Sequence, residues 1–199
     1  TGYDRSQFIS AYGTAQDFEN FNNNTDWVDE VTQHGFTHDH NLSVSGGGDK
    51  AKFRASFGYY NQTGTVIGQE MTRFSNRMNL DYNVSSKLMF SADFSITYTD
   101  NDKNYSDDPD GNDNLLNLAR KRMPNTSVFR QDANGNNTDV YFNIAQNSQV
   151  DASQRDLRNP VAIADLASWQ QTSMRIMPTL RLQYDFFDPA GEAKLRYSG

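Results

Sequence analysis

Apolar and polar residues alternate with a period of two along six stretches of the chain. In the most regular stretch, residues 88–99, six consecutive alternate positions are apolar and the positions between them are mostly polar. A period of two is the period of a β-strand, because successive side chains of a strand point to opposite faces of the sheet. The pattern therefore predicts six strands, at residues 40–45, 52–60, 73–82, 88–99, 173–186 and 192–198.

The connections between these strands alternate between short and long. The short ones are residues 46–50, 83–87 and 188–191, and the long ones are residues 62–71 and 100–171. Outer-membrane β-barrels show this asymmetry, since their turns are short on the periplasmic side and their loops are long outside the cell. We therefore expect the short turns to face inward and the excursion at residues 100–171 to face outward.

Strand length and aromatic placement also favour a barrel. The longer strands have about nine to fourteen residues, which suits a tilted crossing of the hydrocarbon core better than the five or six residues usual in soluble sheets. Rings recur at strand ends, where interfacial girdles place them at headgroup depth: Tyr59, Phe74, Tyr82, Tyr98, Tyr184 and Phe186. The expected fold class is all-β, an antiparallel transmembrane β-barrel segment of about six strands with short helices in a long extracellular loop. Since open sheet edges cannot persist in lipid, these strands must belong to a larger closed ring.

Composition agrees with this interpretation and excludes others. The hydrophobic fraction is 36% and the mean hydropathy is −0.81, which a barrel tolerates because only alternate strand residues are apolar. No run of about 18 apolar residues exists, so helical membrane spans are excluded. The absence of cysteine excludes a disulfide framework and cysteine-ligated zinc. The net charge of −7, with acids and bases interspersed, offers no basic surface to a nucleic acid.

The predicted organisation has four parts. Residues 1–37 form an extracellular loop or strand-entry segment, residues 38–100 four barrel strands, residues 101–171 the long extracellular loop, and residues 172–199 two further strands. Within the long loop, residues 114–123 and 160–169 predict short helices capped by Asp113 and Asn159. Because the chain starts at Thr1 without a signal peptide and stops within a strand pattern, we expect it to be an excerpt of a longer protein.

Charged side chains of the strands should share the face opposite the apolar one, toward the barrel lumen. There they either contact a plug or a passing solute, or form cross-strand ion pairs that only keep the wall polar. The candidates for lumen-facing positions are Lys52, Arg54, Arg73, Arg77, Asp81, Asp93, Arg175, Arg181 and Asp185.

The long loop offers two further kinds of candidate. Four aromatic residues could stack on sugar faces, contact a lid protein or pack within the loop itself: Tyr105, Phe129, Tyr141 and Trp169. A run of acidic residues is either a weak calcium site or a solvated turn, because its glycine is misplaced for an EF-hand loop: Asp107, Asp108 and Asp110.

Catalytic chemistry has little support in the sequence. No GxSxG, HExxH or phosphate-cradling glycine loop is present, so we expect no catalytic residue, no cofactor and no enzyme activity. His38 and His40 share a face at strand spacing, but a metal site lacks a clear third ligand. With His34 they are interpreted as loop histidines that precede the first strand.

Several short motifs together resemble a known family. They are Asn24-Thr25-Asp26-Trp27, residues 41–47 (NLSVSGG), residues 55–59 (ASFGY) followed by Gly64, and residues 77–81 (RMNLD). In order and spacing they resemble the early barrel of SusC-like transporters of Bacteroidetes. The resemblance covers residues 24–100 closely and, through Asn159-Pro160-Val161-Ala162, residues 159–186 loosely.

The resemblance implies a barrel of about 22 strands that is plugged by a separate domain. It further implies that TonB supplies the energy for transport and that the plug of the parent chain contacts TonB. A SusD-like surface lipoprotein, also implied by the resemblance, helps capture oligosaccharides or peptides. The implied location is the outer membrane, in contact with its lipid. Two alternatives stay open: a soluble β-rich carbohydrate-binding module whose apolar faces form a two-sheet core, and a structural outer-membrane barrel without transport.

Overall fold

The computed structural model describes residues 18–105, 114–148, 150–187 and 195–199. They fall into two compact units, each treated separately. The sheet unit contains Phe36–Thr63, Glu70–Asn101 and Gln171–Gly199, and the loop unit contains Thr1–Gly35, Gly64–Gln69 and Asp102–Gln170.

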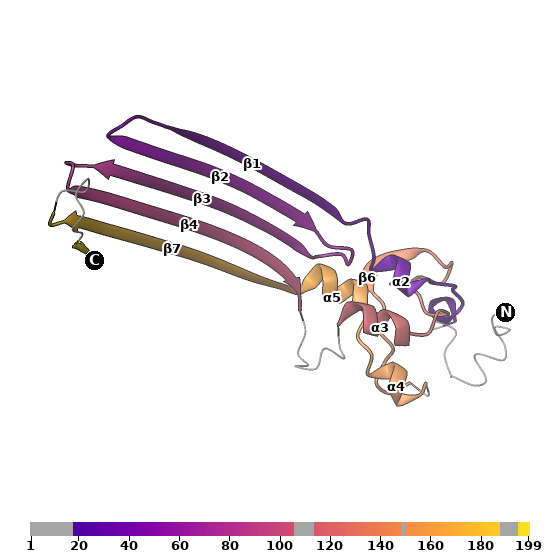
Figure 1. Cartoon of the computed structure of the whole chain (residues 1–199). Coiled ribbons are helices and arrows are strands. Elements are labelled where there is room, and N and C mark those ends of the chain that lie inside the picture. The colour runs from indigo at the N-terminus through magenta and orange to yellow at the C-terminus, as the bar shows by residue number, and fades with distance from the viewer. Residues whose placement is uncertain (1–17, 106–113, 149, 188–194) are drawn as a thin grey trace. The chain divides into compact units, whose positions relative to one another are not determined.

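A six-stranded sheet with the order β1-β2-β3-β4-β7-β8 forms the sheet unit. Its strands β1 to β4 and β7 lie side by side in one layer (Figure 1). This confirms the predicted antiparallel all-β fold with six strands. The strands are β1 (Phe36–Gly47), β2 (Ala51–Thr63), β3 (Glu70–Asn83), β4 (Leu88–Asn104), β7 (Ser168–Asp185) and β8 (Arg196–Ser198).

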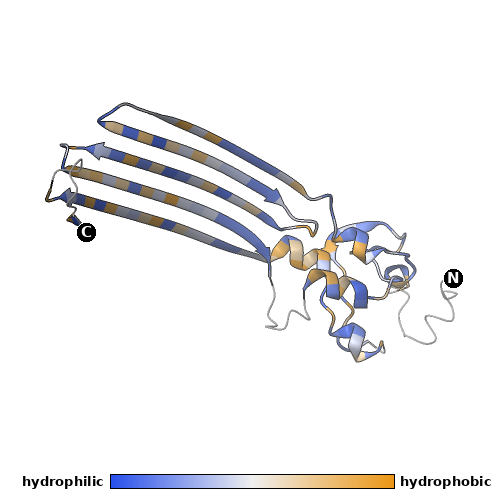
Figure 2. Ribbon diagram, in the orientation of Figure 1, coloured by the Kyte–Doolittle hydropathy of each residue, from blue (hydrophilic) through white to orange (hydrophobic). Residues whose placement is uncertain are grey.

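Antiparallel pairing without offset keeps the two faces of the sheet chemically distinct. Leu42 pairs with Phe57, and Phe53 pairs with Leu80, so apolar residues of neighbouring strands share one face. Figure 2 shows the resulting alternation of hydrophilic and hydrophobic residues along each strand. Since a shift of one residue would move a whole strand's side chains to the other face, the alternation itself specifies this register.

The β1–β2 turn is tight because of one glycine. Gly47 has a φ of +154°, and a Cβ atom there would overlap Ala51 O and Lys52 Cα. Glycine adopts this backbone geometry without the steric cost that any other residue would meet. The short predicted connection at residues 46–50 is thus a turn that joins two long strands directly.

Several strand ends differ from the sequence prediction. β1 starts at Phe36 instead of residue 40, and β7 starts at Ser168 instead of residue 173. The second predicted helix accordingly ends at Leu166 rather than Trp169. β7 also runs through Pro178. Strand ends follow the backbone hydrogen bonds that a neighbouring strand offers, and these extend beyond the alternating pattern.

The loop unit contains short elements around a small core. They are η1 (Glu19–Phe21), α2 (Trp27–Glu30), α3 (Leu115–Lys121), β5 (Phe129–Gln131), β6 (Asn137–Tyr141), α4 (Ala152–Arg155) and α5 (Pro160–Leu166). Two predicted helices are present as α3 and α5, whereas α4 and the β5–β6 pair were not predicted. The cap of α3 is Asn114, whose side chain accepts from Asn117 N, and not Asp113. In the described part of the chain, no helix has the length and apolar character needed to cross a membrane.

Trp27 is the centre of the loop unit. Its side chain is buried with Val31 and Ala119, and its indole N–H donates to Met123 O at 2.9 Å. The guanidinium of Arg122 lies 5.0 Å from the Trp27 ring centroid and donates to two backbone oxygens, Leu157 O and Phe142 O. Burial lowers the pKa of Arg122 to about 10, so the side chain stays cationic at neutral pH.

Asn159 joins the start of α5 to the rest of the loop unit. Its side chain is 1% exposed, and its oxygen accepts from Val161 N and Ala162 N as the helix cap. Its amide group donates to Val128 O at 2.8 Å and to Phe142 O at 3.0 Å. The predicted cap is therefore confirmed, and it also satisfies two carbonyls of distant segments.

Replacement of Asn159 by alanine should destabilise this unit by about 3 kcal/mol, because a helix cap and two further hydrogen bonds to backbone carbonyls are lost together. Asp151→Ala is the matched control, since Asp151 is an exposed cap that accepts from Ser153 N. That change should cost about 1 kcal/mol. Amide hydrogen exchange at the start of α5 in the full-length protein measures the effect, and equal losses in the two variants would contradict it.

Candidate functional site

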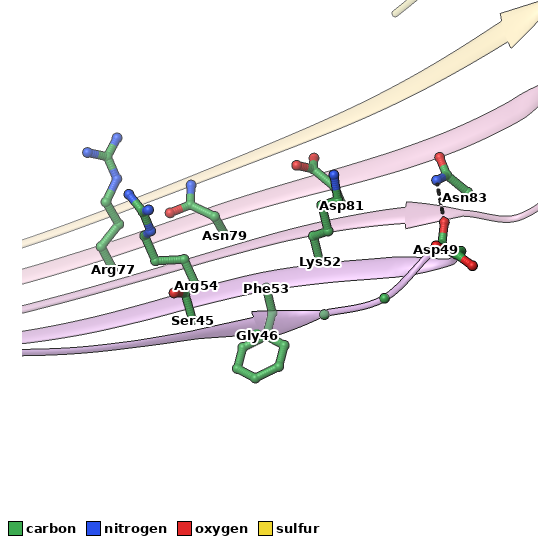
Figure 3. Close-up of a pocket in the computed structure, with 12 residues that line it drawn as sticks. Ser45, Gly46, Asp49, Lys52, Phe53, Arg54, Arg77, Asn79, Asp81 and Asn83 are labelled. Carbon is green, nitrogen blue, oxygen red and sulfur yellow. Dashed lines mark hydrogen bonds between the residues drawn. The ribbon is translucent and has the colours of Figure 1, made fainter.

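One face of the sheet unit collects the predicted lumen-facing charges. In the register of β2 and β3, Lys52 lies opposite Asp81 and Arg54 lies opposite Asn79. Ser45 of β1 is the partner of Arg54 on its other side. Figure 3 shows these side chains on one side of the sheet and Phe53 on the other. The sequence assignment of residues to a common face is consistent with this geometry.

Some of these charges are paired across strands. Arg77 Nε lies 3.5 Å from Asp93 Oδ1, and the Arg73 guanidinium lies 5.0 Å from the Tyr60 ring centroid. Asp185 accepts two hydrogen bonds from Arg196, at 2.7 and 3.3 Å. Exposed pairs of this kind contribute about 1 kcal/mol or less each.

Other cations of the polar face have no carboxylate partner in the part of the chain that the structure describes. Within the described residues, no carboxylate lies within 4.0 Å of the charged group of Lys52, Arg54, Arg175 or Arg181. Near the short turns, the polar face is hollowed over a volume of about 1070 Å³, lined by three cationic and two acidic side chains. This hollow could hold a polar segment or solute, with Lys52 and Arg54 able to donate hydrogen bonds to it.

The opposite face carries an apolar band that only Asn76 interrupts on β3. On β3 it runs from Phe74 to Tyr82, and Met78 lies at its middle. Eight residues of strand span about 27 Å, or about 20 Å of depth at a tilt of about 40°. With the rings at both ends, this approaches the apolar band of about 25 Å that outer-membrane barrels present to lipid. Large apolar side chains here are widely exposed, Met78 by 51% and Leu42 by 67%.

Aromatic rings lie at both ends of the band. At the end away from the short turns, the Tyr59 and Phe74 rings are 5.1 Å apart. At the turn end, Tyr184 and Phe186 make an edge-on contact at 5.0 Å, and Tyr82 pairs with the first residue of β2. Rings that mark both limits of an apolar band are typical of membrane interfaces.

The histidine pair occupies a different place from the one expected. His38 and His40 lie within β1, not in a loop before it, and both are exposed on the apolar face. Their rings are 6.1 Å apart and stacked. Histidine was not counted as part of the apolar pattern, which is why the start of the strand was placed too late. Among the described residues, no three histidine, aspartate or glutamate side chains are grouped as a metal site requires.

The loop aromatics are only partly brought together. Phe129 of β5 and Tyr141 of β6 stack at 4.9 Å, and the Tyr141 hydroxyl donates to Asp165 Oδ2 at 2.9 Å. Desolvation and this carboxylate raise the pKa of Tyr141. Trp169 lies at the start of β7 with 52% of its surface exposed, and Tyr105 follows the end of β4. The calcium candidates Asp107, Asp108 and Asp110 lie outside the described residues.

The β5–β6 hairpin was missed although its turn has a sequence signal. Asp132-Ala133-Asn134-Gly135-Asn136 is a dense run of turn-forming residues. Asp132 Oδ1 accepts from Asn134 N at 2.8 Å and Asn136 N at 2.9 Å, and these bonds lower the pKa of Asp132. The hairpin places Phe129 and Tyr141 opposite each other, so this signal would have located the stacked pair.

Known proteins match parts of the chain. No family model matches. TonB-dependent receptor P3 of Formosa agariphila is 35% identical over 65 residues, which are 33% of this chain and 6% of that receptor. TonB-dependent receptor SusC of Bacteroides thetaiotaomicron is 31% identical over 75 residues, covering 33% of this chain and 8% of SusC. The chain thus spans less than a tenth of these relatives' lengths.

A solved structure extends the comparison to most of the chain. The RagAB peptide transporter superposes with a TM-score of 0.58 and 20% identity, over 90% of this chain and 19% of that one. At this identity the match shows the fold alone, an antiparallel sheet that is not closed in this chain. The sequence matches and the fold agree, and both make this chain similar to a part of SusC-like TonB-dependent receptors.

Proposed function

We propose that the whole protein imports oligosaccharides or peptides across the outer membrane in a TonB-dependent manner. In this proposal the present chain forms part of the barrel wall and its outer loops. The observation that carries it is the sheet unit, which has a ring-bordered apolar band on one face and unpaired cations on the other. Such a sheet is stable where lipid covers one face and water or protein the other.

The orientation follows from the connections. We assign residues 38–100 and 172–199 to the wall and residues 1–37 and 101–171 to the outside of the cell. The tight β1–β2 turn at Gly47 supports a periplasmic position for the short turns, because outer-membrane barrels keep their periplasmic turns short. The folded core around Trp27 supports a structured outer loop rather than a plain connection.

The proposed partners are those that this architecture requires. Outer-membrane lipid covers the apolar band, and a plug domain of the parent chain, which contacts TonB, meets the polar face. The hollow beside Lys52 and Arg54 is the place on this face that suits a plug segment with acidic or carbonyl groups. A SusD-like lipoprotein and cargo are assigned to the loop unit, where Trp169 and the exposed edges of Phe129 and Tyr141 offer stacking surface.

The alternatives lack comparable support. A soluble carbohydrate-binding module would cover its apolar face with a second sheet, whereas the sheet unit is a single layer with large exposed apolar residues. A structural barrel without transport would share every strand feature, but the sequence relatives are TonB-dependent receptors. We assign no catalytic role to any residue. Fractionation of the full-length protein tests the main proposal, which fails if the protein stays in the aqueous phase without detergent.

Labels on neighbouring residues of β3 should report opposite environments. This chain contains no cysteine, so spin labels at Met78→Cys and Asn79→Cys can be compared in the full-length protein in lipid, with any other cysteine replaced. The label at position 78 should collide mainly with oxygen dissolved in lipid, and the label at position 79 mainly with a water-soluble nickel chelate. Equal access of the chelate to both labels would refute the assignment of the faces.

A charge at the middle of the band should be costly. Met78→Arg is expected to reduce the unfolding free energy of the protein in lipid vesicles by about 2–4 kcal/mol, since an arginine at the bilayer midplane must be desolvated or pulled to the surface. Asn79→Arg on the other face is the matched control, with an expected change within about 0.5 kcal/mol. Denaturant titration of vesicle-bound protein measures both, and similar values for the two variants would contradict a lipid-covered band.

A further inference from the structure

Five rings form a continuous ladder across the apolar face of β1, β2 and β3, at the end of the apolar band that lies away from the short turns. The centroid distances along the ladder Phe36–His38–His40–Tyr59–Phe74 are 4.9, 6.1, 6.3 and 5.1 Å. The two stacked contacts, His38–His40 and His40–Tyr59, have interplanar angles of 14° and 13°. The ladder thus ties two imidazoles to the rings that close the apolar band.

The register gives the depth of each imidazole. His40 is paired with Tyr59, and Tyr59 is paired with Phe74, so His40 lies level with the boundary of the band. His38 lies two residues further out, about 7 Å along the strand. The headgroup region adds about 5–7 Å to each side of the hydrocarbon core. With the band in lipid, His38 lies at headgroup depth and His40 at its inner limit.

The surroundings leave both imidazoles available for a ligand. Neither ring makes a hydrogen bond or ion pair to a described residue, and both are exposed. On the same face, His38 is paired with Asn61, whose side-chain amide donates to Glu70 Oε1 at 2.9 Å and to Thr72 Oγ1 at 3.0 Å. Glu70, the acidic group of this region, is therefore already engaged with a neighbour.

We propose that His38 and His40 bind the phosphate group of an outer-leaflet lipid. An imidazole carries at least one N–H donor in either protonation state, and two imidazoles whose ring centroids lie 6.1 Å apart can reach one phosphate or two adjacent ones. The rings pack against lipid chains while their N–H groups meet the headgroups, as amphipathic rings do at membrane interfaces. This proposal rests on the proposed function, since it requires the apolar band to be in lipid.

The experiment separates the ring from its donor groups. Full-length protein purified in detergent is titrated with lipid A that carries its phosphates and with the same lipid A after enzymatic dephosphorylation, and bound lipid is counted by native mass spectrometry. H38F/H40F keeps the aromatic ladder but removes both N–H donors, and H38N/H40N keeps side-chain donors. H34F is the matched control, because His34 lies outside β1. Far-UV circular dichroism confirms that each variant has the wild-type strand content.

The expected result is a phosphate-specific loss. H38F/H40F should bind phosphorylated lipid A about tenfold more weakly than wild type, which corresponds to one hydrogen bond to a charged group. Its binding of dephosphorylated lipid A should be unchanged, H38N/H40N should retain most of the affinity, and H34F should match wild type. The proposal is overturned if H38F/H40F binds phosphorylated lipid A as wild type does, or if it loses both lipids equally. A protein that never requires detergent would instead disprove the proposed function.

Discussion

Cross-strand pairing without offset is the constraint on which the sheet depends. In this register apolar residues of β2 meet apolar residues of β3, as Phe53 does with Leu80, and charged residues meet charged ones, as Lys52 does with Asp81. Hydrogen bonds between strands satisfy the backbone N–H and C=O groups of every inner strand. Alternate side chains of each strand then lie on opposite faces of the sheet, one apolar and one polar. The band, the ring ladder and the hollow on the polar face are all consequences of this one register.

The loop unit is stabilised in a different way. Its core is small, and its buried polar side chains, Arg122 and Asn159, connect segments that are far apart in the sequence. Both side chains donate to Phe142 O, so that they form one network of buried hydrogen bonds whose members support each other. A long excursion from a barrel can therefore keep a defined surface without a large hydrophobic core.

The sequence predicts the sheet well and the loop unit poorly, for physical reasons. Alternation is a local signal, so the sequence is sufficient to locate β2, β3 and β4. Because alternate residues of a strand share a face, it also assigns Arg77 to the polar face. The pattern does not predict the first residues of β1, because His38 is polar by composition although its ring lies on the apolar face. In the loop unit, short strands such as β5 carry no measurable period, and the burial of Arg122 depends on tertiary contacts that no local pattern encodes.

The long connection between β4 and β7 has a consequence for assembly. Every other described pair of neighbouring strands is joined by an adjacent connection, whereas 63 residues separate Asn104 from Ser168. Closing a chain of that length costs about 3 kcal/mol more than closing the three-residue β1–β2 turn, if the chain is flexible. The hydrogen bonds around Trp27 and Asn159 reduce the cost by shortening the flexible part. Strands β1 to β4 can therefore pair one after another as hairpins. β7 can pair with β4 after the connection between them has become compact.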